Sequence, residues 1–286
     1  MNSVLIILAI LLFVLQTLSL KLIRAETLSE KLLSNFLFTL LAAAAMGVLT
    51  ILFPGFRGIS AGTLVCGCLF GLMFSLTILF YLSAISCGPL SYTSFYLSAS
   101  MLLPACAGLL FFKEAFSPSL LIALFFFLAA FYLLNVTGED QKADKKWLVF
   151  CILTFLCNSS SGIIQKTQQL LSGGTEAVGM MMAGFCAASL CYGTAYLCTP
   201  SRVRVMSVLS RNVIPVCLLA AASLGGNLLL TYLSGINDGS YLFPLVQGSI
   251  ILGVTVCSVL FFHEKLTLRG KLGILAGTVG IIIINL

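Results

Sequence analysis

Ten long apolar runs, separated by short polar connections, constrain the fold of this chain more than any other feature. A helix of about 20 apolar residues spans the hydrocarbon core of a bilayer. Backbone polar groups in lipid must pair within the protein, and these unbroken runs lack the alternation of barrel strands. The sequence therefore predicts an all-α integral membrane protein with ten transmembrane helices in a lipid bilayer. The runs cover residues 3–20, 33–53, 61–85, 90–111, 118–136, 147–170, 177–198, 213–234, 240–262 and 268–286.

The composition excludes a soluble globular protein. Only 8% of the 286 residues are charged and 60% are hydrophobic, whereas a soluble domain has about 25% charged residues. The formal net charge is +6, but no basic run is long enough to bind nucleic acid, and we expect no such partner. The eleven cysteines lie in or beside apolar runs and are expected to be small buried hydrophobic residues. The first run lacks the basic start and small-residue site of a cleaved signal, so we expect a helix there.

The basic residues predict the orientation. If the runs alternate across the membrane, twelve of the fifteen Lys and Arg fall on one side and three on the other. Cytoplasmic connections carry the basic excess, so both termini are expected outside the cytoplasm. The side with three holds Arg57, Lys113 and Lys166.

The second half of the sequence repeats the first at a shift of about 150 residues. Phe111–Glu114 (FFKE) match Phe261–Glu264 (FFHE), and Tyr81–Ile85 (YLSAI) match Tyr232–Ile236 (YLSGI). Similar composition alone could also produce such matches. Because five helices is an odd number, the halves would cross the membrane in opposite directions, as in alternating-access carriers with a site near the midplane. We expect a first five-helix repeat at 1–137, a cytoplasmic linker at 138–146 and a second, inverted five-helix repeat at 147–286.

The two repeat ends resemble a known family. The stretch FFHEKLTLRGKLGILAGTVGIIIINL at Phe261–Leu286, with its weaker copy at Phe111–Asn135, is similar to the ten-helix EamA-type members of the drug/metabolite transporter superfamily. The first copy lacks the glycines of the last helix. This resemblance implies secondary transport of small metabolites, often export of amino acids or related compounds, through a central cavity formed by helices 1 to 4 and 6 to 9.

Neutral polar residues inside the runs are the candidates for contacting a substrate. Two glutamines, 149 positions apart, occupy related places in the halves, and two tyrosines four residues apart share a helix face. The alternative is that these amides and hydroxyls join neighbouring helices. Prolines 104, 215 and 244 are expected to bend or break their helices. The substrate-binding candidates are Gln16, Gln165, Asn158, Tyr92, Tyr96, Asn227 and Gln247.

The ionisable residues suggest gating or coupling positions. All nine acidic residues fall in connections or at the ends of runs, so a proton-driven cation antiporter is not expected. Lys166 either extends to the membrane surface or pairs with a substrate carboxylate. Glu114 and Glu264 are either helix-end charges or gating groups, and His263 is either a surface residue or a proton sensor.

The sequence favours a transporter over an enzyme. One histidine, no acidic residue inside a run, no CxxC pair and no phosphate loop leave no evident catalytic set, and we expect no cofactor or metal. The expected function is secondary transport of small polar metabolites, by alternating access, in a bacterial plasma membrane. A flippase of a lipid-linked substrate and a non-transporting membrane partner remain alternatives. A homodimer through peripheral helices is one assembly that the sequence allows, and the oligomeric state cannot be read from it.

The orientation can be measured with reporters. A reporter fused after Leu286 should be active only outside the cytoplasm, and one inserted into 138–146 only inside it, because the basic connections stay in the cytoplasm. A cytoplasmic reporter signal at Leu286 would contradict the assignment.

Overall fold

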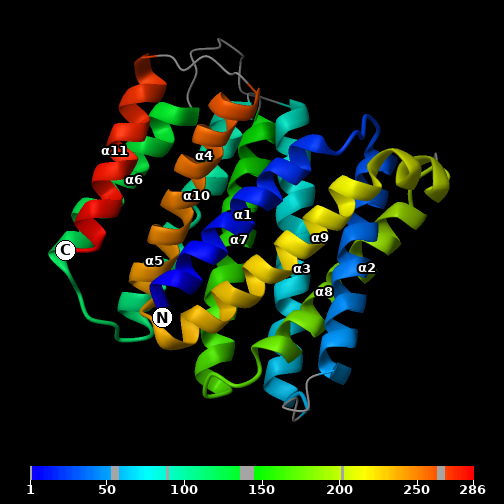
Figure 1. Cartoon of the computed structure of the whole chain (residues 1–286), viewed down its shortest axis with the longest axis horizontal. Helices are drawn as coiled ribbons and strands as arrows, with labels where there is room; N and C mark the ends of the chain where they lie inside the picture. Colours follow the sequence, from blue (N-terminus) through cyan, green and yellow to red (C-terminus); the bar gives the residue numbers. More distant parts are fainter. Residues whose placement is uncertain (1, 53–57, 88–89, 136–144, 201–202, 263–267) are drawn as a thin grey trace. The chain divides into compact units, whose positions relative to one another are not determined.

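The protein is all-helical in the part of the chain that the structure describes. A computed structural model describes residues 2–52, 58–87, 90–135, 145–200, 203–262 and 268–286 (Figure 1). Its helices are α1 Asn2–Leu22, α2 Leu28–Leu52, α3 Ala61–Cys87, α4 Leu90–Ala99, α5 Leu102–Leu110, α6 Pro118–Asn135, α7 Lys145–Leu171, α8 Ala177–Leu197, α9 Val205–Ile236, α10 Gly239–Phe262 and α11 Leu268–Ile284.

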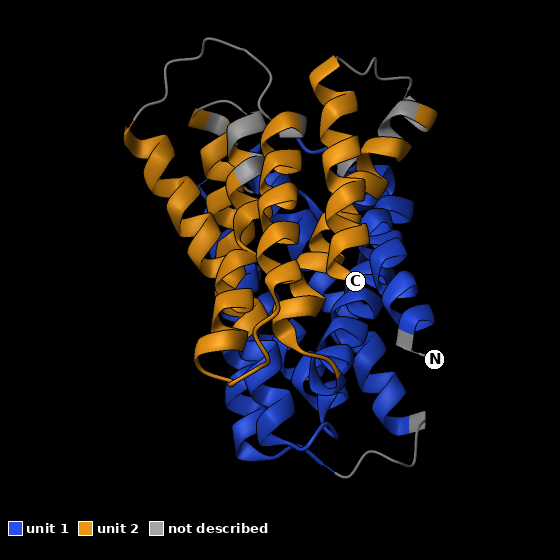
Figure 2. Ribbon diagram, turned by 90° about the vertical axis from the view of Figure 1, so that its left-hand side faces the viewer, with its two compact units in different colours: residues 1–75, 164–236 blue, residues 76–163, 237–286 orange. Residues whose placement is uncertain are grey.

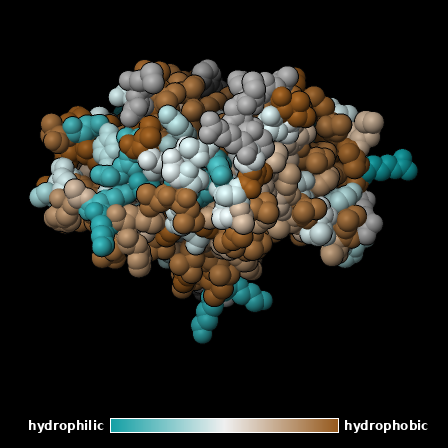
Figure 3. Space-filling model, turned by 90° about the horizontal axis from the view of Figure 1, so that it is seen from below, coloured by the Kyte–Doolittle hydropathy of each residue, from teal (hydrophilic) through white to brown (hydrophobic). Residues whose placement is uncertain are grey.

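Seven of the described helices are long and apolar enough to cross a membrane. They are α1, α2, α3, α7, α8, α9 and α10, and shorter apolar helices occur at Tyr96–Leu110 and Pro118–Leu133. Large hydrophobic side chains remain exposed on many helices, as at Ile51 and Ile214, which are 84% and 71% exposed. Hydrophobic residues also cover much of the face seen in Figure 3. These features are compatible with a multi-pass membrane protein.

The predicted run 90–111 is divided into two helices. Ser100 and Met101 separate α4 from α5, and Pro104 lies in the first turn of α5. Proline has no N–H to donate to the carbonyl four residues earlier, which is that of Ser100. The hydroxyl of Ser159 on α7 lies 2.7 Å from this carbonyl oxygen and donates to it. Pro104 therefore coincides with a break, whereas Pro215 and Pro244 lie inside the continuous helices α9 and α10.

The chain forms two compact units, and each takes segments from both predicted repeats. Unit 1 comprises residues 1–75 and 164–236, and unit 2 comprises 76–163 and 237–286 (Figure 2). Two of the three unit boundaries fall inside α3 and α7, so each of these helices contributes to both units, and the third follows the end of α9. In unit 1, α1 packs on α9, α2 packs on α8 and α9, and α8 packs on α9. In unit 2, α6 packs on α11 and α4, and α10 packs on α5, α6 and α11.

Small residues allow α3 and α8 to approach closely within unit 1. A side-chain carbon at Gly67 would lie 2.6 Å from the Cβ of Ala183, and one at Gly71 would overlap the backbone carbonyl of Gly184. A substituted residue would therefore force the helices apart. Gly67 and Gly71 are four residues apart, a spacing that is typical of helices in close contact.

The α3–α8 contact can be tested by adding one methyl group. Gly71→Ala should lower stability by about 1–3 kcal/mol, because the backbone of Gly184 cannot move aside without shifting α8. Gly62→Ala is a matched control in the same helix, since no described atom beyond the neighbouring backbone of α3 lies within 4 Å of the added carbon. Thermal unfolding in detergent measures both. Equal melting temperatures for the two variants would contradict the packing.

Candidate functional site

Polar side chains follow one face of α7. Thr154, Asn158, Ser161, Gln165 and Gln168 succeed one another at spacings of three or four residues, which places them on the same side of a helix. We call these five residues the polar face of α7. All except Asn158 are buried, and Asn158 is half-buried. A polar face on a helix that is apolar enough to span a membrane indicates contact with protein or water rather than lipid.

A second polar face runs along α9. Ser223, Asn227, Thr231 and Ser234 are spaced by three or four residues, and all four are buried. The amide of Asn227 donates to the backbone carbonyl of Ser223 at 2.8 Å. We call these four residues the polar face of α9, and they belong to unit 1 with the end of α7.

The two polar faces meet in unit 1. Nε2 of Gln165 lies 3.5 Å from Oδ1 of Asn227, at the limit of a hydrogen bond. Nearer the end of α7, a side-chain carbon at Gly235 of α9 would lie 2.7 Å from Oε1 of Gln169. The missing side chain of Gly235 therefore lets the Gln169 amide lie against the backbone of α9. The predicted candidates Gln165 and Asn227 are thus brought together.

Sequence reasoning missed two glutamines that extend this contact. Gln168 is 0% exposed and its Nε2 donates to the Thr63 hydroxyl of α3 at 3.0 Å. Gln169 is 2% exposed and its Nε2 donates to Oε1 of Gln168 at 2.6 Å. We call Gln165, Gln168, Gln169 and Asn227 the amide cluster. The signal in the sequence was the spacing of three or four residues that continues from Asn158 to Gln168.

Several buried oxygens near the amide cluster have no hydrogen-bond partner among the residues that the structure describes. They include Oε1 of Gln169 and the hydroxyls of Ser223 and Thr231 on the polar face of α9. An unsatisfied buried polar group costs about 1–3 kcal/mol. These oxygens can accept hydrogen bonds from a bound molecule. The same is true of Gln16 on α1, whose Oε1 is also buried without a partner.

Lys166 brings a charge into this region. Its side chain is 6% exposed, and it is the only Lys, Arg, Asp or Glu that is buried among the described residues. Its neighbours in sequence, Gln165, Gln168 and Gln169, are neutral and buried.

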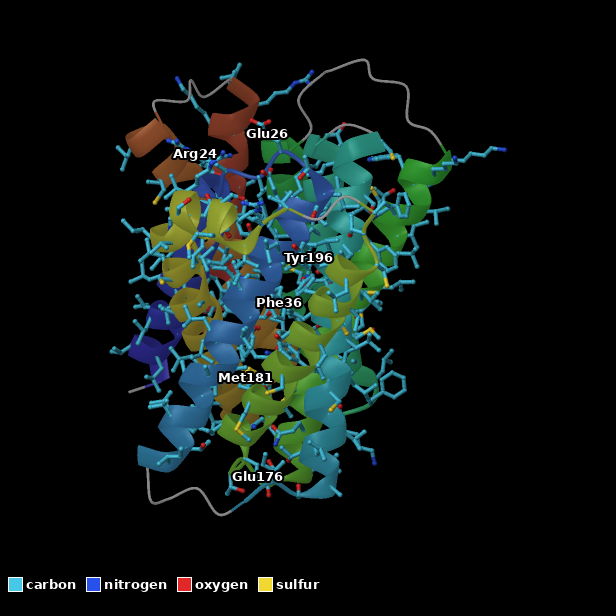
Figure 4. All side chains as sticks on the ribbon, turned by 90° about the vertical axis from the view of Figure 1, so that its right-hand side faces the viewer. Arg24, Glu26, Phe36, Glu176, Met181 and Tyr196 are labelled. Carbon is cyan, nitrogen blue, oxygen red and sulfur yellow. The ribbon has the colours of Figure 1, made fainter. Side chains whose placement is uncertain are left out.

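Glu176 lies at one end of unit 1, near the amide cluster. Figure 4 places Glu176 at this end and Arg24 and Glu26 at the opposite one, with Met181 between them. Oε2 of Glu176 accepts from the hydroxyl and the backbone N–H of Ser60 at 2.7 and 3.0 Å. The hydroxyl of Thr63, followed by these two donors, holds the pKa of Glu176 below its ordinary value. Thr63 thus links this carboxylate to Gln168.

Two predicted candidates lie at the contact of α7 with the break between α4 and α5, in unit 2. Nδ2 of Asn158 donates to the Ser100 hydroxyl at 2.5 Å. Tyr96 packs edge-on against Trp147, with ring centroids 6.2 Å apart. The indole N–H of Trp147 donates to the Thr93 hydroxyl at 2.9 Å. These contacts join α4 to α7, and the sequence alone did not single out Thr93 or Trp147.

Glu114 follows α5 in the chain, and its carboxylate lies at the N-terminus of α10. Its carboxylate accepts from the backbone N–H groups of Gly239 and Ser240 at 2.7 and 2.8 Å. A negative charge is favourable at a helix N-terminus, where N–H groups lack partners. Gly108 of α5 makes room, because a side-chain carbon there would overlap the carboxylate. Lys113, just before Glu114, has a left-handed backbone conformation with φ 54°.

Two of the remaining predicted residues lie on other helices, and three lie wholly or in part outside the described residues. Gln16 is half-buried on α1 in unit 1, and Gln247 is half-buried on α10 in unit 2. Tyr92 lies in α4, but its side chain is outside the described part of the structure, as are His263 and Glu264. Among the described residues, no group of three His, Cys, Asp or Glu side chains could hold a metal ion.

Comparison with known proteins identifies a shared fold. The sequence matches no protein-family model and no curated protein. One solved crystal structure, described only as that of a protein, superposes with a TM-score of 0.77 at 17% sequence identity. The match covers 99% of this chain and 95% of the other. At this identity the likeness concerns the fold alone, and the chain shares that fold over nearly its whole length.

Proposed function

We propose that this protein is a secondary transporter of small polar metabolites that works by alternating access. The observation that carries the proposal is the meeting of two buried polar faces, on α7 and α9, at Gln165 and Asn227. Both helices are long and apolar enough to span a membrane. Polar groups inside such helices are costly and tend to serve substrate pathways.

The helix contacts support an arrangement of two inverted repeats. In the proposed repeat, α2 corresponds to α8, the α4–α5 pair corresponds to α10, and α6 corresponds to α11. Each of these helices packs against its own counterpart: α2 on α8, α5 on α10 and α6 on α11. A two-fold relation between the halves would produce such contacts. The break between α4 and α5 also fits, because carriers of this kind use discontinuous helices.

The chemistry of the amide cluster suits a small, polar metabolite. Amides and hydroxyls can both donate and accept hydrogen bonds, and they orient a ligand through several weak contacts. Amino acids and related compounds are the proposed substrates, in line with the resemblance to EamA-type carriers. Transport is proposed to need no proton, because the described acidic side chains are all half-buried or exposed. The substrate gradient, with the membrane potential for a charged substrate, would then drive it.

Counterflow in proteoliposomes tests this function. Vesicles loaded with a mixture of unlabelled amino acids should take up a labelled member of that mixture from outside, without a pH gradient or a membrane potential. Gln165→Ala should weaken apparent affinity by up to about tenfold, because it removes one or two hydrogen bonds worth about 0.5–1.5 kcal/mol each.

Ser160→Ala is the matched control on the same helix. Its hydroxyl is off the polar face and donates to the carbonyl of Leu156, at 2.8 Å, in its own helix, so uptake should not change. Absence of counterflow for every compound, together with transbilayer movement of lipid, would contradict the proposal and favour a flippase. Equal affinities for the wild type and Gln165→Ala would remove Gln165 from the site.

A further inference from the structure

A chain of hydrogen bonds leads from one end of unit 1 into the amide cluster. It begins at the carboxylate of Glu176, which accepts from the hydroxyl of Thr63. Nε2 of Gln168 donates to that hydroxyl at 3.0 Å, and Nε2 of Gln169 donates to Oε1 of Gln168 at 2.6 Å. The chain ends at Oε1 of Gln169, which is buried and has no hydrogen-bond partner among the described residues. All four residues belong to unit 1.

The carboxylate sets the direction of every bond in this chain. An ionised carboxylate can only accept hydrogen bonds, so the Thr63 hydroxyl donates its proton to Glu176. The Thr63 oxygen is then left to accept, and the amide nitrogen of Gln168 faces it. This orientation turns the Gln168 oxygen toward the amide nitrogen of Gln169. Gln169 therefore has its oxygen at the end of the chain, where it can only accept.

The end of the chain lies against α9. A side-chain carbon at Gly235 would be 2.7 Å from Oε1 of Gln169, so the oxygen faces a position that has no side chain to donate. The hydroxyl of Thr231, about one turn earlier on the same face, also lacks a partner in the part of the chain that the structure describes. The amide of Asn227, a further turn away, donates to the carbonyl of Ser223. The α7–α9 contact thus presents two buried oxygens to a donor that the described residues do not supply.

We infer that Gln169 is a substrate-binding residue whose side-chain oxygen accepts a hydrogen bond from an amino or hydroxyl group of the transported molecule. Such an oxygen selects a ligand with a donor group over an analogue without one, because the analogue leaves a buried acceptor unpaired. Glu176 is a positioning residue, which acts on the ligand through Thr63 and Gln168. This inference rests on the proposed function and narrows the substrates to small molecules with an N–H or O–H donor.

Matched pairs of ligands test the inference on the wild-type protein. Glycine and its N,N,N-trimethyl derivative carry the same charges at neutral pH, but only glycine has N–H donors. L-Serine and O-methyl-L-serine compare a hydroxyl donor with its methyl ether. Binding is measured by thermal unfolding in detergent, and transport by counterflow in proteoliposomes. In at least one pair the ligand with the donor should bind about tenfold more tightly, and that pair identifies the donor as amino or hydroxyl.

Gln169→Met separates the lost hydrogen bond from the size of the added methyl groups. Methionine is an unbranched, flexible side chain that can fill the same space without the amide. The steric effect of methylation should remain in this variant, whereas the preference for the donor ligand should fall by about tenfold relative to the wild type. If Gln169→Met fails to fold, the wild-type preference and the following variant decide.

Glu176→Gln tests the direction of the chain. A glutamine at position 176 can donate as well as accept, so Thr63 and both amides can turn over and present the nitrogen of Gln169 instead of its oxygen. The preference for the donor ligand should fall by about threefold or more, whereas a merely structural defect would weaken both members of a pair equally. Glu26→Gln is the control, because Glu26 is exposed at the opposite end of unit 1, and it should keep the wild-type preference.

The outcomes distinguish this inference from the proposed function. Equal binding within both pairs, or an unchanged preference in Gln169→Met, would overturn the role of Gln169, and counterflow of the amino-acid mixture would still support the transporter. A preference that depends on Gln169, without counterflow of any ligand, would support the binding site and contradict transport.

Discussion

The structure depends on one constraint: most of the polar groups buried among its apolar helices find partners within the protein. In a bilayer no water is available to replace a missing hydrogen bond. The polar face of α7 meets this requirement through Ser100, Thr63 and Asn227, which come from three different parts of the chain. These contacts fix which side of α7 faces the protein interior. The polar residues that suggest a function are therefore also residues that determine the fold.

The break between α4 and α5 follows from the same constraint. Pro104 leaves the Ser100 carbonyl without a backbone N–H donor four residues later. The Ser159 hydroxyl donates to that carbonyl instead, and it also lies 2.7 Å from the carbonyl oxygen of Phe155. Glu114 plays a similar part at the first turn of α10, where Gly239 and Ser240 have N–H groups to donate. In both places a local interruption of helical bonding is satisfied by a distant side chain.

The helices could be predicted from the sequence, but most of their partners could not. Each apolar run contains a described helix because length and hydrophobicity leave few alternatives. Gln165 and Asn227 were identified because single amides stand out in apolar runs. Gln168 was missed because it lies in the last turn of α7, where a polar residue is unremarkable. Gln168 matters because its amide donates to the hydroxyl of Thr63, about a hundred positions earlier in the chain. Tertiary packing decides which residues pair over such a distance.

The most direct test of the account asks whether the polar face of α7 meets water. Single cysteines would be placed along 154–172 in a functional variant whose native cysteines have been replaced, and then treated with a small, water-soluble thiol reagent. The account predicts that labelling peaks every third or fourth residue, at Asn158, Ser161, Gln165 and Gln168, and that substrate reduces it. No labelling on this face, or labelling confined to positions such as Leu156 and Ser160, would contradict a transport route along α7.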